Sequence, residues 1–152
     1  MKIFNKIFNT DSNLASLFLR ISFSWMMIPH GAGKLFGLFG GFGFEKSMQM
    51  FTTHFGIPWA ISLFVFSVEF FSSLGILIGL KTRINAFLLA STMFVAGTFH
   101  IKYGFYMNWF GKKAGEGFEF HILAVGMMLA LMMIGGGKYS LDQKLIEYKH
   151  GK

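Results

Sequence analysis

The chain has 152 residues, of which 53% are hydrophobic and only 14% are charged. Soluble domains typically carry about a quarter charged residues, and the mean hydropathy of this chain is +0.52. The length suits one domain. The composition excludes a disordered chain and a coiled coil, and it favours a lipid bilayer as the solvent.

The formal net charge is +7, which in a soluble protein would suggest a nucleic-acid partner. Here the Lys and Arg residues lie at the ends of apolar runs, so we interpret them as membrane-flanking cations and expect no nucleic-acid partner. Cysteine is absent from the sequence, which excludes a disulfide framework and a thiolate metal site. Redox chemistry would therefore need a bound cofactor, a quinone or a partner protein.

Four apolar runs are long enough to cross about 30 Å of hydrocarbon as helices. In chain order they cover about residues 14–30, 58–80, 84–103 and 119–134. No period-2 alternation marks a strand. The sequence thus predicts an all-α, polytopic membrane protein whose single domain is a four-transmembrane-helix bundle.

Local signals mark the ends of these helices. Asp11, Ser12 and Asn13 are N-cap candidates for the first helix. Pro58 occupies a favoured first position for the second. The run Gly135-Gly136-Gly137 ends the fourth.

The outer connection, residues 31–57, is rich in Gly and Phe. Its second half, residues 45–55, places Met48, Phe51 and Phe55 at helical spacing. This pattern fits a helix lying in the membrane interface. An ordered loop packed over the mouth of the bundle fits it equally well.

The distribution of cations predicts the orientation in the membrane. One face carries eight Lys and Arg residues: Lys2, Lys6, Lys81, Arg83, Lys138, Lys144, Lys149 and Lys152. The opposite loops carry five: Lys34, Lys46, Lys102, Lys112 and Lys113. The richer face is expected to be cytoplasmic, with both termini inside.

Two charged residues lie at membrane depth, where each needs a partner or a water-filled cavity. Arg20 lies about 9 Å from the cytoplasmic boundary, and Glu69 about 16 Å from it. An Arg side chain can reach across the difference of about 7 Å, so we predict an ion pair between Arg20 and Glu69. The alternatives are an Arg20 that snorkels to the headgroups and a protonated Glu69.

A second polar cluster is predicted at the outer face, where the helix ends of an up-down-up-down bundle converge. His30 ends the first helix, His100 lies near the end of the third, and Glu119 and His121 begin the fourth. Lys34 lies just beyond the first helix. The alternative for each His is an interfacial residue hydrogen-bonded to a loop carbonyl or a headgroup.

Known catalytic and metal-binding motifs are missing. The sequence contains no HExxH or other tight ligand spacing, so no metal is predicted. Gly31-Ala-Gly33-Lys34 lacks the spacing of a phosphate-binding loop. The two Asp residues, Asp11 and Asp142, both lie on the predicted cytoplasmic side, which leaves Ser-His-Asp catalysis unsupported.

Several motifs taken together resemble the DoxX family of small four-helix bacterial membrane proteins. In chain order they are Arg20, His30-Gly-Ala-Gly-Lys-Leu-Phe-Gly37, Phe55-Gly-Ile-Pro58, Glu69, Gly79-Leu-Lys-Thr-Arg83, His100, Glu119 and Gly137-Lys-Tyr-Ser-Leu-Asp142. The resemblance covers about residues 14–142. It implies a multi-pass protein of the bacterial inner (cytoplasmic) membrane. Some relatives are named as subunits of a thiosulfate:quinone oxidoreductase, and others associate with enzymes of oxidant defence.

The resemblance and the buried charges lead to a first hypothesis of function, a redox or oxidative/sulfur-stress accessory. In it a small ligand or quinone headgroup lies between the helices. Arg20 and Lys34 are its cations, Glu69 and Glu119 handle protons, and His100 donates a hydrogen bond to the ligand. Such a protein is at most a subunit of a quinone-linked oxidoreductase with a membrane or soluble redox partner.

Two other hypotheses remain open. The first is a non-enzymatic membrane scaffold or assembly factor, in which the same charges fix helix register and the outer loop docks a partner protein. The second is a small transporter, which four helices could form only as a homo-oligomer.

Overall fold

The computed structural model describes residues 8, 10, 12–149 and 151, and this part of the chain is helical, with no strand. The longer helices are α2 (Ala15–Phe36), α3 (Gly43–Gln49), α4 (Trp59–Ser67), α5 (Ser73–Ile78), α6 (Thr82–His100), α7 (Glu119–Ile134) and α8 (Leu141–Lys149). Short 3₁₀ and π segments connect or interrupt them: η1 (Leu38–Gly40), η2 (Met50–His54), η3 (Val68–Ser72) and η4 (Ile101–Tyr103). The prediction of an all-α protein is confirmed.

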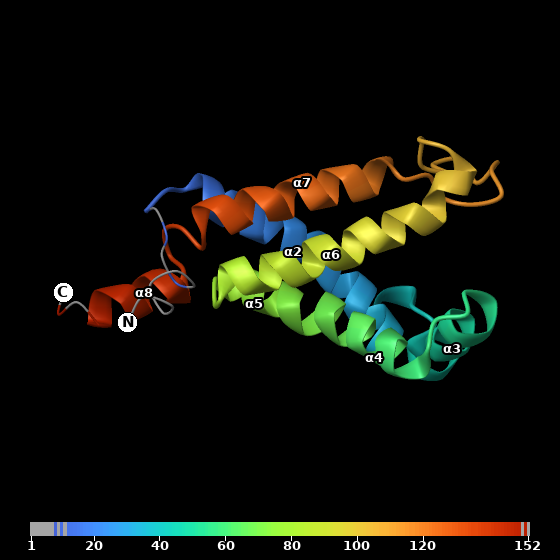
Figure 1. Cartoon of the computed structure of the whole chain (residues 1–152), viewed down its shortest axis with the longest axis horizontal. Coiled ribbons are helices and arrows are strands. Elements are labelled where there is room, and N and C mark those ends of the chain that lie inside the picture. Colours follow the sequence, from blue (N-terminus) through green and yellow to red (C-terminus); the bar gives the residue numbers. More distant parts are fainter. Residues whose placement is uncertain (1–7, 9, 11, 150, 152) are drawn as a thin grey trace.

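The long helices run back and forth between two ends of the molecule (Figure 1). We call the end that carries α8 and the turn between α5 and α6 the terminal end. The opposite end, which carries α3, η2 and residues 104–118, is the loop end. The chain crosses between these ends in α2, returns in α4–η3–α5, crosses again in α6 and returns in α7.

Two of these crossings are long and apolar enough to span a membrane. Residues 59–78 form 20 helical residues with a mean hydropathy of 2.1, and residues 82–103 form 22 with a mean hydropathy of 1.5. Helix α7 is apolar and shorter. The exterior of the bundle is apolar as well, since Trp25, Phe18 and Phe94 are 83%, 66% and 66% exposed. Large exposed apolar surface of this kind suits a hydrocarbon solvent.

The predicted bounds hold for three of the four runs. Helix α7 begins and ends at the predicted residues, and the second and third runs agree within two residues at each end once η4 is counted. At the first helix, Asn13 accepts a hydrogen bond from the backbone N–H of Ser16 at 3.0 Å, as an N-cap residue does. Lys2, Lys6, Asp11 and Lys152, which the predictions also used, lie outside the described residues.

The predicted end of the first helix at His30 is wrong. Helix α2 continues through Pro29 and ends at Phe36, before Gly37, whose φ is 71°. Gly31, Ala32 and Gly33 are buried in this last part of α2. The helix therefore persists past the proline because its final turns pack against other segments, which a local helix-end signal does not report.

Much of the outer connection is helical and is not an irregular loop. Residues 43–54 are helical in α3 and η2, with Met48 buried, and the segment packs against α2 and α4. The helix predicted in this region is confirmed, and its place in the membrane interface stays a prediction. The packing over the bundle that the alternative interpretation expected is also present.

Candidate functional site

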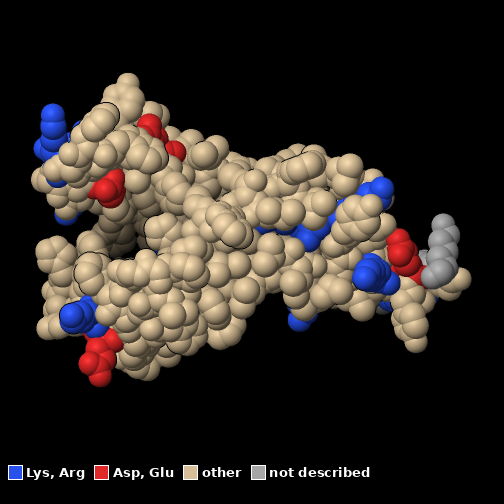
Figure 2. Space-filling view, turned by 180° about the vertical axis from the view of Figure 1, so that it is seen from behind, with Lys and Arg blue, Asp and Glu red and all other residues tan. Residues whose placement is uncertain are grey.

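A cavity of about 570 Å³ opens at the loop end of the bundle. Figure 2 shows its mouth as a hollow between two lobes. Residues of α2, η2, α4, η3, α6 and the start of α7 line it. Most of the lining is apolar, and a few polar side chains converge at one side. Concave sites with this mixture are typical of small-molecule binding.

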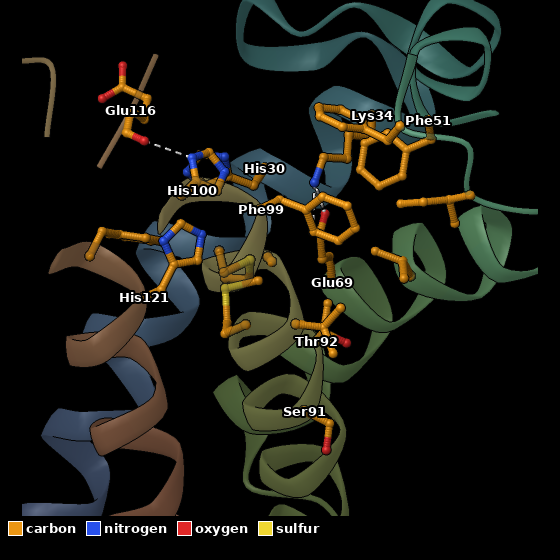
Figure 3. Close-up of a pocket in the computed structure, with 18 of the residues that line it drawn as sticks. His30, Lys34, Phe51, Glu69, Ser91, Thr92, Phe99, His100, Glu116 and His121 are labelled. Atoms are coloured by element: carbon orange, nitrogen blue, oxygen red, sulfur yellow. Dashed lines mark hydrogen bonds and ion pairs between the residues drawn. The ribbon is translucent and has the colours of Figure 1, made fainter. Parts of the chain in front are cut away.

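The main polar feature of the cavity is an ion pair between Lys34 and Glu69 (Figure 3). Lys34 Nζ donates to Glu69 Oε1 at 2.6 Å and to Oε2 at 2.5 Å. The Glu69 side chain is only 4% exposed, whereas that of Lys34 is 24% exposed. Lys34 therefore neutralises the buried carboxylate and also presents its ammonium group to the cavity.

Aromatic rings surround the ammonium group of Lys34. Its Nζ lies 5.4 Å from the ring centroid of Phe51 and 5.9 Å from that of Phe66. Both distances are within the range of a cation–π attraction. The rings also limit the directions from which a ligand can reach the ammonium.

Glu69 lies in the π-helical segment η3, in the middle of the second crossing. A π segment is a local irregularity that often occurs at functional sites. The Ser73 hydroxyl donates to the backbone carbonyl of Glu69 at 2.6 Å, and the Ser24 hydroxyl donates to that of Ser73 at 2.9 Å. These bonds attach the irregular turn to α2.

Gly31 allows α2 to approach η3 closely enough for the ion pair to form. A Cβ atom at this position would lie 2.6 Å from the backbone nitrogen of Phe70 and 2.9 Å from the carbonyl carbon of Glu69. A second close contact joins Gly33 to Gly41, where a Cβ on Gly41 would lie 2.3 Å from the Cα of Gly33. The motif from His30 to Gly37 thus contains small residues because two segments of backbone pack directly against it.

Three imidazoles line the cavity beside the ion pair. The rings of His100 and His121 are 4.7 Å apart, and His100 Nδ1 lies 2.9 Å from the backbone carbonyl of Glu116. Because a carbonyl only accepts, that Nδ1 carries a proton and donates. His121 Nδ1 is buried and has no hydrogen-bond partner within the described part of the chain. His30 is on the same wall, on α2 one turn before Lys34.

The predicted ion pair between Arg20 and Glu69 is wrong. Arg20 is 1% exposed, but its guanidinium donates to the backbone carbonyls of Leu77 at 2.8 Å and Lys138 at 3.0 Å, near the terminal end. The physical reason is the direction of helical side chains, since each Cα–Cβ bond tilts toward the N-terminus of its helix. Arg20 therefore leans toward the terminal end. Lys34, further along α2, leans back toward Glu69, and Glu69 on the antiparallel crossing leans toward the loop end.

The structure also places Glu119 outside the cavity lining. Its Oε1 accepts hydrogen bonds from the backbone N–H of Met107 at 2.8 Å and from Trp109 Nε1 at 3.4 Å. Glu116 Oε2 accepts the backbone N–H of Asn108 at 2.7 Å. The two carboxylates thus hold the segment between α6 and α7 in place.

Five of the seven predicted site residues therefore meet at one cavity. They are His30, Lys34, Glu69, His100 and His121, and Arg20 and Glu119 are separate from them. The prediction missed the aromatic residues Phe51 and Phe99 in the lining. The helical spacing of Phe51 with Met48 was the available signal, because it places the outer segment against the bundle.

The donor set of the cavity does not resemble a metal centre. Within the described residues, no group of three or more His, Cys, Asp or Glu side chains is placed to hold a metal ion. The described lining offers instead one ammonium group, two carboxylates, three imidazoles and two hydroxyls for hydrogen bonds to a ligand.

One of three comparisons with known proteins identifies a family. A family model described as DoxX matches residues 15–101, which include His30, Lys34, Glu69 and His100. Searches of curated proteins and of solved structures each found no match.

Proposed function

Because this chain belongs to the DoxX family, we propose that it is a multi-pass protein of the cytoplasmic membrane that binds a quinone or a similar small ligand between its helices. In that role it is an accessory of a redox system, such as the response to oxidative or sulfur stress. The cavity at the loop end is its binding site.

The proposed topology has four membrane crossings, α2, α4–η3–α5, α6 and α7, with both termini in the cytoplasm. The alternating directions of these helices support it (Figure 1). The orientation rests on the sequence count of eight Lys and Arg residues on the face of the terminal end against five on the other, and three of the eight, Lys2, Lys6 and Lys152, lie outside the described residues. Excess Lys and Arg are typical of cytoplasmic loops.

The observation that carries the functional proposal is the Lys34–Glu69 pair open to a cavity in the middle of an apolar crossing. Ionisable residues at such depth are costly, and they usually mark ligand or proton sites. A quinone head presents two carbonyl oxygens, which accept hydrogen bonds from ammonium and imidazole N–H groups. Lys34 is the donor expected to contact it, whereas His100 can donate through Nε2 only as an imidazolium, because its Nδ1 proton is directed at the Glu116 carbonyl.

The test is the quinone content of the full-length protein purified in native lipids, measured by mass spectrometry after extraction. The wild type is expected to carry quinone, and the variant Glu69→Gln is expected to lose about 90% of it because Lys34 is then misplaced. Glu45→Gln is the matched control, since Glu45 is exposed on α3 and outside the lining. A wild type without quinone that also binds none when it is added would overturn the proposal.

The double variant Lys34→Met with Glu69→Leu separates binding from folding. It leaves no buried charge without a partner, so it is expected to fold. It is also expected to bind no quinone, because the hydrogen-bonding groups are gone. Retention of quinone by this variant would place the ligand elsewhere.

A scaffold for a partner protein is the second candidate function. The observation that favours it is the exposed aromatic tip of the segment between α6 and α7, where Trp109 is 79% and Phe110 is 86% exposed. Aromatic residues are enriched in protein interfaces. The double variant Trp109→Ser with Phe110→Ser is expected to lose a specific partner that co-purifies from native membranes, with its quinone content unchanged.

A further inference from the structure

The cavity has a second side that faces away from the loop end, between α4 and α6. Ile61 and Phe64 on α4, and Ser91 and Val95 on α6, line the cavity and are also exposed. We call these four residues the lateral gap. Figure 1 shows α4 and α6 diverging with distance from the turn that joins α5 to α6, with α2 behind them. Helix α6 packs along α5 and η3, which leaves the part of the cavity beside α4 open to the exterior of the bundle.

The lateral gap lies within the two crossings that are most clearly of membrane length, residues 59–78 and 82–103. Its three large residues are apolar and are about half exposed, at 52% for Ile61, 56% for Phe64 and 54% for Val95. At that depth the medium outside the helices is hydrocarbon. A contact between Phe55 and Phe99, with ring centroids 5.8 Å apart, joins the two walls at the loop end.

The polar side of the cavity holds no unpaired cation among the described residues. Lys34 is paired with Glu69, the other charged side chain in the lining is the carboxylate of Glu116, and the remaining nitrogen-bearing side chains there are imidazoles. A phosphate head group would need an unpaired cation, because burying a charge without a partner is costly. The site therefore favours an uncharged head with oxygen atoms that form hydrogen bonds.

From these observations we infer that the ligand is a lipid with an uncharged, oxygen-bearing head, and that it enters sideways from the bilayer through the lateral gap. Its head lies against Lys34 and Glu69, and its tail passes between α4 and α6. The inference rests on the proposed function for the location of the site, and it adds the lipid class of the ligand and the route by which it enters.

The test compares two ligands on the full chain in lipid nanodiscs. One is a benzoquinone with a long prenyl tail, and the other is the same head without the tail. Val95→Trp fills the lateral gap with an indole ring. Phe94→Trp is the matched control, because Phe94 is exposed on the same helix and is not in the cavity lining. Ligand occupancy over time is measured by native mass spectrometry.

Val95→Trp is expected to slow binding of the tailed quinone by about tenfold or more, a barrier of at least about 1.4 kcal/mol. It should slow binding of the tail-less quinone much less than that of the tailed quinone, since the tail-less molecule can use the mouth at the loop end. Phe94→Trp should change neither ligand. If Val95→Trp alters neither ligand while both bind the wild type, the lateral route is overturned and the proposed function stands.

Two further outcomes test the proposed function and the preference for an uncharged head separately. If the wild type binds neither quinone, the proposed function fails, and this inference fails with it. If adding anionic phospholipid to the nanodiscs displaces the tailed quinone, the preference for an uncharged head is wrong. Occupancy that is independent of anionic phospholipid is the expected result.

Discussion

Replacing Gly31 by Ala is expected to separate α2 from η3 and to weaken the site that these two segments form. The new Cβ atom would lie 2.6 Å from the Phe70 nitrogen, 2.7 Å from the Phe70 Cα and 2.9 Å from the carbonyl carbon of Glu69. All three atoms belong to the backbone, so no side-chain rotation relieves the contact. Ordinary contact begins at 3.4 Å, and η3 must therefore retreat by about 0.8 Å.

The expected cost follows from this displacement. Overpacking of a tight contact typically destabilises a protein by about 1–3 kcal/mol. For a chain of this size each kcal/mol lowers Tm by about 2–4 °C, which gives a drop of about 2–12 °C. A retreat of the same size would lengthen the Lys34–Glu69 contact beyond the usual range of a charge-assisted hydrogen bond, about 2.7–2.9 Å. Quinone content should fall with it.

The assay is thermal unfolding of the purified protein, followed by intrinsic tryptophan fluorescence, together with quinone content. Gly126→Ala is the matched control, because Gly126 lies within a helix and a Cβ there meets nothing within 4 Å. Alanine is favoured over glycine in a helix by about 1 kcal/mol, so the control should keep or raise Tm. Equal effects of the two substitutions, or a Gly31→Ala protein with wild-type Tm and quinone, would refute the close-approach argument.

Two predictions concern the terminal end. Arg20→Met removes the donors to two partly buried backbone carbonyls, so the free energy of unfolding from a chemical denaturation curve should fall by about 1–3 kcal/mol. Quinone content per folded molecule should stay unchanged, and its loss would contradict the separation of Arg20 from the cavity. Asp142 accepts the backbone N–H of Lys81 at 2.7 Å and that of Thr82 at 2.8 Å, at the start of α6. Asp142→Ala should therefore lower the free energy of unfolding by about 1–3 kcal/mol in the same measurement. An unchanged denaturation curve would mean that these two hydrogen bonds add no net stability.

The helical segments could be predicted closely because their signals are local. The apolar runs and the glycines after residue 134 mark the bounds of α7 without any knowledge of the neighbouring helices. The same local reasoning failed at the end of α2, where Pro29 and the glycines that follow it are ordinarily helix-ending residues. There the helix is maintained by packing of Gly31 and Gly33 against backbone from elsewhere in the chain.

The sequence predicted which residues line the cavity more accurately than it predicted which of them form the ion pair. Depth along a helix axis suggested Arg20 as the partner of Glu69, and the structure gives Lys34. The tilt of each Cα–Cβ bond toward the helix N-terminus decides between them, since it directs Arg20 away from Glu69 and Lys34 toward it. That rule could have been applied to the sequence only if α2 had been known to continue as far as Lys34.

The sequence by itself determined that this is a helical chain suited to a membrane, because hydrophobicity and chain length act segment by segment. It also determined that a buried carboxylate at residue 69 must have a partner, because an unpaired charge in hydrocarbon is too costly. Only the tertiary structure decided which cation that partner is and that a cavity opens beside the pair. Both depend on how closely α2 and η3 approach at Gly31, and on the divergence of α4 from α6, which are distances between segments far apart in the chain.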